Sequence, residues 1–227
     1  MNLQYLRAKL DRLNEQIVSR LKDRSRFVIN EAVYRPGAIP IRNQNNISLM
    51  EWALEGMERY HATLGRYELP DQLPLRNDVV TASPVQRRVD MPLLPVITPP
   101  PRDELFRFYT ALLPEFCKLG DDPQNYGETA YADADVLVRI NERIYLGAFV
   151  ARSKVERVPE IIRLSDDPSA IREKFRDRER EAIVIERAQQ AAWRYMINPD
   201  VIEKVFRWMI EQTIDLEVRY VQKMALL

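Results

Sequence analysis

The sequence is short of the residues that most often build redox, metal and nucleophilic sites. Its 227 residues include one cysteine, Cys117, and one histidine, His61. A single cysteine excludes an intramolecular disulfide and a cysteine metal cluster, and a single histidine excludes a metal site built on several imidazole ligands. We interpret both residues as structural, Cys117 as a small packing residue and His61 as a neighbour of Trp52 on one helix.

Charge imbalance and long apolar runs are also missing. Lys plus Arg number 34 and Asp plus Glu number 34, so no net charge attracts nucleic acid or an acidic membrane surface. No apolar run reaches the roughly 18 residues that span a bilayer, and the N-terminal residues are charged where a secretory signal would be apolar. We therefore expect a reduced, cytoplasmic, globular protein with neither a membrane nor a nucleic acid as partner.

Glycine is scarce, with six in the chain, and the longest segments show helical spacing. Leucine and isoleucine recur every three or four residues over residues 3–21, which places an apolar stripe on one helix face. Ser48, followed three residues later by Glu51, has the form of a capping box and predicts a second helix that runs to about Gly65.

Further helices are predicted in the second half of the chain. Asp103 is expected to cap the first of them, and Asn198 followed by Pro199 suits the start of the last. The predicted helices extend over residues 104–119, 128–155, 159–164, 169–176, 178–195 and 199–225.

Proline is concentrated between residues 70 and 101, where each one removes a backbone hydrogen-bond donor. We expect an ordered but irregular connection wrapped over the helices, because apolar residues such as Val79, Leu93 and Ile97 are too many for a disordered segment. No segment alternates with period two, and no Asn-Gly or Asp-Gly turn links two strands. The sequence predicts a single all-α, multi-helix bundle over residues 1–227, with little or no β-structure.

The segment RIYLGAFVARSK places a cation at each end of a small, apolar stretch of the long predicted helix. Arg143 and Lys154 are eleven residues apart, which is about three turns, so they share a face and lie about 16 Å apart along the axis. Gly147 between them costs roughly 1 kcal/mol relative to alanine. It indicates either a close neighbouring helix or a hollow between the cations. Spacing alone leaves open that both charges are simply exposed.

Two other helices carry acidic residues beside apolar positions. Asp177 and Glu181 are four residues apart, with Arg180 next to them, near a helix start where the dipole favours acids. Thr213 and Glu217 share a face of the last helix. If Glu217 is drawn into the apolar side of that helix, desolvation raises its pKa. Charge bias at a helix start is the alternative explanation of the first pair, and an amphipathic helix with Glu217 in solvent is that of the second.

Arg7 borders the apolar stripe of the first helix, where a side chain that reaches past the edge into solvent is common. With the three segments above, it completes a set of cations, acids and a hydroxyl carried by four helices. Because arginine binds carboxylates through two parallel hydrogen bonds, such a set suits a pocket for a small dianion that carries a hydroxyl and a central oxygen.

Four stretches, in order along the chain, resemble the all-helical chorismate mutases of the larger fungal and plant type. Residues 6–27 and 48–74 resemble the first two helices of that family, with Leu69 and Gln72 as departures. GDDPQNYGETA resembles its loop before the long helix, and RIYLGAFVARSK resembles a segment of that helix. DREREAIVIER is closer to the short bacterial enzymes, so the chain mixes features of both groups.

The resemblance implies an active site inside a four-helix core that converts chorismate to prephenate by an intramolecular rearrangement, without a cofactor or metal. Arg7 and Arg143 correspond to the arginines that hold the two carboxylates. Lys154 and Glu217 correspond to the groups on the two sides of the ether oxygen. The other pocket residues that it implies are Asp177, Arg180, Glu181 and Thr213.

The resemblance also implies a homodimer with an aromatic amino-acid effector at the subunit interface. Arg66, Asn125 and Gly127 match positions of that effector site, whereas Gly65 and Glu128 depart from it. We therefore expect weak or altered control by tyrosine or tryptophan.

Two alternatives to the mutase reaction remain. One is a related enzyme, an isochorismate pyruvate-lyase or an aminodeoxychorismate mutase, although Glu181 mildly favours a substrate with a hydroxyl at C4. The other is a helical interaction protein that has lost the chemistry. The presence of Arg7, Arg143, Lys154 and Glu217 argues against it.

Overall fold

The computed structural model describes residues 3–76, 78–79, 83–88 and 91–227. Over these residues the regular structure is helical, without a β-strand, and the only extended pairing is an isolated bridge between Ile41 and Gln44. The all-α prediction is therefore confirmed. None of the described helices combines the length and the apolar character that crossing a membrane requires.

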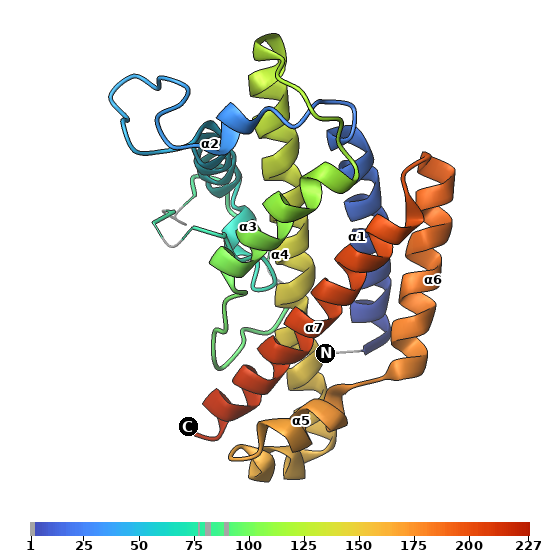
Figure 1. Cartoon of the computed structure of the whole chain (residues 1–227). Helices are drawn as coiled ribbons and strands as arrows, with labels where there is room; N and C mark the ends of the chain where they lie inside the picture. The colour runs from blue at the N-terminus through green and yellow to red at the C-terminus, as the bar shows by residue number, and fades with distance from the viewer. Residues whose placement is uncertain (1–2, 77, 80–82, 89–90) are drawn as a thin grey trace.

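Four long helices form the part of the molecule that holds the predicted site residues. They are α1 (Leu3–Arg24), α4 (Tyr126–Arg157), α6 (Arg178–Tyr195) and α7 (Pro199–Met224). Figure 1 shows α4 running through the middle, with α1 beside it, α6 on the far side of α1, and α7 crossing in front. In this arrangement α4 packs against α1 and α7, and α6 packs against both of these, so the four helices surround a common interior.

The other helices extend this group at its two ends. Figure 1 shows α2 (Leu49–Thr63) on the opposite side of α4 from α6, α3 (Arg102–Leu112) crossing in front of α4, and α5 (Pro168–Phe175) at the bottom, near the ends of α4 and α7. The short 3-10 helices are η1 (Glu31–Tyr34), η2 (Arg66–Glu68), η3 (Leu113–Glu115), η4 (Pro123–Asn125) and η5 (Pro159–Leu164).

Two of the predicted helix caps form as expected. The Ser48 hydroxyl accepts a hydrogen bond from the backbone N–H of Glu51 at 3.2 Å, and the Glu51 carboxylate accepts from the N–H of Ser48 at 3.3 Å. The Asn198 side chain accepts from the N–H of Asp200 at 3.0 Å, with Pro199 as the first residue of α7. The local sequence thus sets where α2 and α7 begin.

Three predicted boundaries need correction. Asp103 is not a cap, because α3 begins one residue before it and Asp103 lies in the first turn. The predicted helix over 104–119 ends at Leu112 and continues only as η3, since Pro114 cannot donate to the helical ladder. The long helix α4 begins two residues earlier and ends two residues later than its predicted range of 128–155.

A buried ion pair joins α1 to α4. Arg24 and Asp133 are both fully buried, and Arg24 Nε lies 2.6 Å from Asp133 Oδ1. The hydroxyls of Tyr34 and Tyr109 donate to the same carboxylate at 2.7 and 2.6 Å, and the guanidinium also donates to three backbone carbonyls. Because a buried pair is tolerated only when its remaining donors and acceptors are satisfied, this network fixes how α1 lies against α4.

The connection over residues 70–101 is irregular as predicted, although residues 77, 80–82 and 89–90 lie outside the described part. It is anchored by Glu58 of α2, which is buried and accepts from the N–H groups of Leu75 at 2.6 Å and Arg76 at 3.0 Å. The expectation that its apolar residues cover the helices is wrong in part. Leu93 and Ile97 are 77% and 59% exposed, whereas Leu75 and Val79 are buried, so only part of the apolar surface of the connection packs on the helices.

Candidate active site

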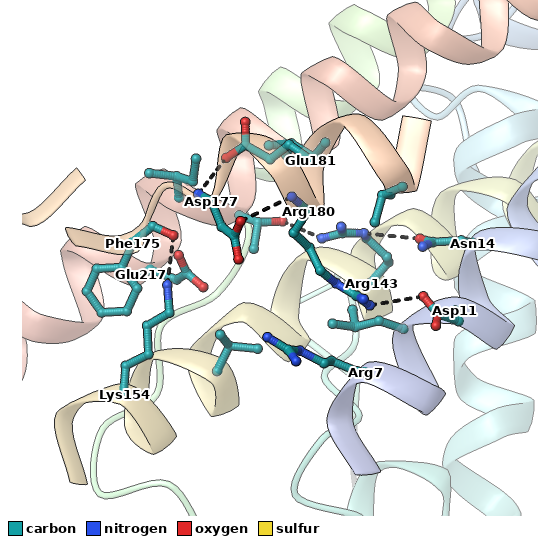
Figure 2. Close-up of a pocket in the computed structure, with 16 residues that line it drawn as sticks. Arg7, Asp11, Asn14, Arg143, Lys154, Phe175, Asp177, Arg180, Glu181 and Glu217 are labelled. Atoms are coloured by element: carbon teal, nitrogen blue, oxygen red, sulfur yellow. Dashed lines mark hydrogen bonds and ion pairs between the residues drawn. The ribbon is translucent and has the colours of Figure 1, made fainter. Parts of the chain in front are cut away.

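A pocket opens where α1, α4, α6 and α7 converge, and Figure 2 shows side chains from all four helices turned toward it. Every residue that the sequence assigned to catalysis or substrate binding lines this pocket. They are Arg7, Arg143, Lys154, Asp177, Arg180, Glu181, Thr213 and Glu217. The eleven-residue spacing of Arg143 and Lys154 therefore places both in one hollow instead of on an exposed helix face.

Arg143 is buried and is held by two neutral groups. Its Nη1 donates to the Thr213 hydroxyl at 2.8 Å, and its Nε donates to the Asn14 side-chain oxygen at 3.4 Å. The Thr213 hydroxyl in turn donates to the carbonyl of Met209 at 2.7 Å, which fixes its orientation. Burial lowers the pKa of Arg143 to about 10, so the guanidinium stays charged at neutral pH. Since neither partner is a carboxylate, its charge is left for a ligand.

Lys154 points into the same pocket from one end of α4. Its ammonium donates to the backbone carbonyl of Phe175 at 2.7 Å and lies 4.7 Å from the centre of the Phe175 ring. A lysine ammonium has three N–H donors, so two remain after the Phe175 contact. The carbonyl and the ring face together restrict where the ammonium can lie.

Glu217 is the acid nearest to these cations in the interior. It is 4% exposed, and burial raises its pKa to about 8, against the opposing influence of Lys154 and Arg143. At neutral pH its carboxyl group therefore carries a proton. A protonated carboxyl can donate a hydrogen bond, whereas an ionised one can only accept. The pocket thus holds an ammonium and a neutral acid side by side, as Figure 2 shows.

The acids at the start of α6 serve the helix end as well as the pocket. Asp177 is the N-cap and accepts from the N–H of Arg180 at 3.1 Å. Glu181 accepts from the N–H of Asp177 at 3.1 Å and lies 3.6 Å from the guanidinium of Arg176. The two explanations left open by the sequence, helix-end charge and pocket lining, therefore both describe this pair. Figure 2 shows the Glu181 carboxylate turned toward the backbone of Asp177.

Gly147 allows α7 to come unusually close to α4. A Cβ atom at this position would lie 2.6 Å from Thr213 Cγ2, 3.4 Å from the Thr213 carbonyl and 3.6 Å from Glu217 Cγ. The first of these distances is far below any normal contact. Of the two reasons that the sequence allowed for this glycine, the close neighbouring helix is the one observed, and that neighbour carries two of the pocket residues.

Among the pocket residues that sequence reasoning missed, Asp11, Asn14 and Phe175 contact the predicted cations directly. Asp11 and Asn14 lie four and seven residues after Arg7, so they share its helix face, and this spacing was a usable signal. Phe175 gave no such signal, because it acts on Lys154 through a backbone carbonyl as well as its ring.

The candidate effector residues lie outside this pocket and apart from one another. Arg66 donates to Glu142 at 2.8 Å and to Gln72 at 2.8 Å, and its third nitrogen lies 3.4 Å from His61. Asn125 donates to the Asp122 carboxylate at 2.6 Å, just before α4 begins. Glu142 is seventeen residues further along α4, a rise of about 25 Å. Within one chain, Arg66 therefore does not meet Asn125 or its neighbour Gly127.

Comparisons with known proteins converge on one enzyme family. The family model described as chorismate mutase type II matches residues 125–218. The chorismate mutase of Trichoderma parareesei is 30% identical over 235 residues, which cover 99% of this chain and 86% of that protein. Chloroplastic chorismate mutase 1 of Arabidopsis thaliana is 31% identical over 172 residues, 70% of this chain and 47% of that protein.

Solved structures agree with these relatives over nearly the whole fold. The Candida albicans chorismate mutase in complex with L-Trp is 28% identical, with a TM-score of 0.87 over 98% of this chain and 91% of that one. AtCM1 with tyrosine bound in an allosteric site is 26% identical, with a TM-score of 0.85 over 99% of this chain and 96% of that one.

The Gly147 contact predicts a loss of stability on Gly147→Ala, although alanine is the better helix former. The added methyl meets Thr213 Cγ2, and Thr213 cannot rotate away without breaking its hydrogen bonds to Arg143 and Met209. We expect the free energy of unfolding to fall by about 1–3 kcal/mol, measured by urea denaturation.

The matched control is the same substitution in a Thr213→Ser background, which keeps the hydroxyl and removes the obstructing methyl group. There the alanine should be neutral or stabilising, because its helix propensity is no longer opposed. Equal effects of Gly147→Ala in the two backgrounds would show that the close contact does not limit this position.

Proposed function

Because this chain belongs to the chorismate mutase family, we propose that it isomerises chorismate to prephenate in the pocket between α1, α4, α6 and α7. The observation that carries the proposal is the pairing of the Lys154 ammonium with a Glu217 carboxyl that is protonated at neutral pH. Two hydrogen-bond donors facing one small space suit a reaction in which negative charge grows on a single oxygen.

The arginines serve to select the shape of the substrate. Chorismate carries two carboxylates and rearranges from a compact, folded conformer. Arg143 deep in the pocket and Arg7 at its exposed rim lie on different helices, so they can hold the two carboxylates apart in a fixed geometry. Holding the reacting ends together accelerates the reaction, because the orientational entropy is lost when the substrate binds and no longer adds to the activation free energy.

Lys154 and Glu217 act on the bond that breaks. In the rearrangement the ether C–O bond breaks as a new C–C bond forms, and negative charge develops on the ether oxygen while positive charge develops on the ring. The two N–H donors that Phe175 leaves on Lys154, and the O–H of Glu217, would meet that oxygen. No bond forms between protein and substrate, and no proton needs to be transferred. Catalysis then rests on donors placed before the reaction starts.

Glu181 is proposed to accept a hydrogen bond from the C4 hydroxyl. One of its oxygens accepts from the N–H of Asp177, and the other lies 3.6 Å from the Arg176 guanidinium, a distance that leaves it able to accept a hydrogen bond from a ligand. A carboxylate also accepts from an ammonium, so this contact alone does not favour chorismate over its 4-amino analogue. Rates with chorismate, isochorismate and aminodeoxychorismate separate these substrates.

The direct test is the loss of chorismate absorbance with purified protein. We expect turnover by the wild type, and a fall of at least about 100-fold in kcat/KM for Arg143→Ala, the size typical for loss of one well-placed charged donor. The matched control is Arg152→Ala, on the same helix but paired with Glu156 outside the pocket, which should retain activity. A wild type that does not consume chorismate would refute the proposed function.

The protonated state of Glu217 predicts a pH profile. Below a pKa of about 8 the carboxyl can donate to the ether oxygen, and above it the donor is lost and a negative charge faces the growing oxyanion. We expect kcat/KM, which reports the free enzyme, to fall about tenfold per pH unit well above that value. Glu217→Gln keeps a donor at every pH, so its profile should stay flat through the same range. An identical fall in the Gln variant would show that another group is responsible.

Effector control is proposed to be weak. Among the structural relatives, the Candida albicans enzyme is in complex with L-Trp, and AtCM1 has tyrosine bound in an allosteric site. In this chain all three nitrogens of Arg66 already have partners, and a site that includes both Arg66 and Asn125 requires two chains, in agreement with a homodimer. We expect saturating tyrosine or tryptophan to change the rate by less than the roughly fivefold of ordinary allosteric coupling. A larger change in initial rate would contradict this expectation.

A further inference from the structure

An acidic side chain, Asp11, stands among the arginines of the pocket. It follows Arg7 by four residues on the same face of α1, and one of its oxygens lies 3.3 Å from Arg180 Nη2. Figure 2 shows the Asp11 carboxylate beside the end of Arg180, on the side away from the Arg7 guanidinium. The charge of Asp11 also reaches Arg143, whose protonated form it favours. The pocket therefore already contains a carboxylate at the place where its guanidinium groups converge.

This carboxylate nearly cancels the positive character of the site. Four basic side chains line the pocket, together with four acidic ones, of which Glu217 is protonated at neutral pH. By formal charge the lining is left with one net positive charge. Neutralising Asp11 would double it. For a site meant to attract a dianion, an acid in this position opposes binding.

The contacts of Asp11 are weak enough for a bound ligand to displace it from Arg180. Its pair with Arg180 is long and partly exposed, so it contributes little free energy. Its other oxygen lies 3.6 Å from Arg187 Nη1. The Arg187 side chain does not line the pocket and is 63% exposed. If Arg180 turned toward a ligand, Asp11 would keep Arg187 as a partner.

We propose that Asp11 is an internal counter-ion that neutralises Arg180 and the neighbouring guanidinium groups in the empty pocket, and that it is displaced from Arg180 when the dianionic substrate binds. This inference rests on the proposed function. Without a ligand, Asp11 reduces the repulsion between Arg7, Arg143 and Arg180, which stabilises the free protein. With a ligand, the Asp11–Arg180 pair must be broken, which weakens binding. The same charge thus has opposite effects on stability and on affinity.

The test is Asp11→Asn, which keeps the shape of the side chain and removes its charge. We expect KM for chorismate to fall about 3- to 10-fold at low ionic strength, with kcat changed by less than about twofold. The melting temperature of the ligand-free variant should fall at the same time. The difference in KM should shrink at high salt, because the groups involved are partly exposed.

Two controls separate the charge of Asp11 from its location. Asp11→Glu keeps the charge and should have a KM close to that of the wild type. Glu15→Gln removes an acid one turn further along α1 that pairs with Arg194 of α6 at 3.4 Å, and Glu15 does not line this pocket. It should leave KM unchanged.

A binding readout keeps this inference separate from the proposed function. Malate, a small dicarboxylate, should raise the melting temperature of Asp11→Asn by more than that of the wild type, whether or not either protein consumes chorismate. An unchanged or increased KM in Asp11→Asn, or a lower kcat at constant KM, would overturn the proposal. The lower kcat would show that Asp11 holds Arg180 in its productive position. Failure of the malate difference would overturn it equally.

Discussion

The contact between α4 and α7 at Gly147 is the constraint on which the site depends. With only a hydrogen atom at this position, α7 comes close enough for the Thr213 hydroxyl to hold Arg143. One turn further along α7, Glu217 is buried against the same face of α4. A side chain at position 147 would move both groups away from the cations they serve. The glycine lowers the intrinsic stability of α4, but it allows the close helix contact that sets the geometry of the pocket.

Burial has opposite consequences for the two kinds of ionisable group that it surrounds. Desolvation disfavours charge in both, yet Arg143 starts so far above neutral pH that a pKa of about 10 still leaves it charged. Glu217 starts below neutral pH, and a pKa of about 8 leaves it protonated. One dry environment thus yields a permanent cation and a neutral donor, the two kinds of group that a dianion with a central oxygen requires.

Three cations of the pocket are restrained before a ligand arrives, but by different means. In the interior, neutral partners hold Arg143 and Lys154, so orienting them does not cancel their charge. At the rim, the charged partner Asp11 holds Arg180. A neutral partner orients a cation without cancelling its attraction for an anionic ligand. A charged partner such as Asp11 stabilises the empty site but weakens ligand binding.

The sequence by itself determined the helices and most of their ends, because apolar spacing and caps such as Ser48 with Glu51 are local properties. It also identified eight of the residues that line the pocket, through a resemblance carried by short ordered motifs. Only the tertiary structure decided that Asn14 holds Arg143, that Phe175 holds Lys154, and that Leu93 stays exposed. These depend on the distance between helices and on side-chain direction, which arise from packing among segments far apart in the chain and leave no periodic trace in any one of them.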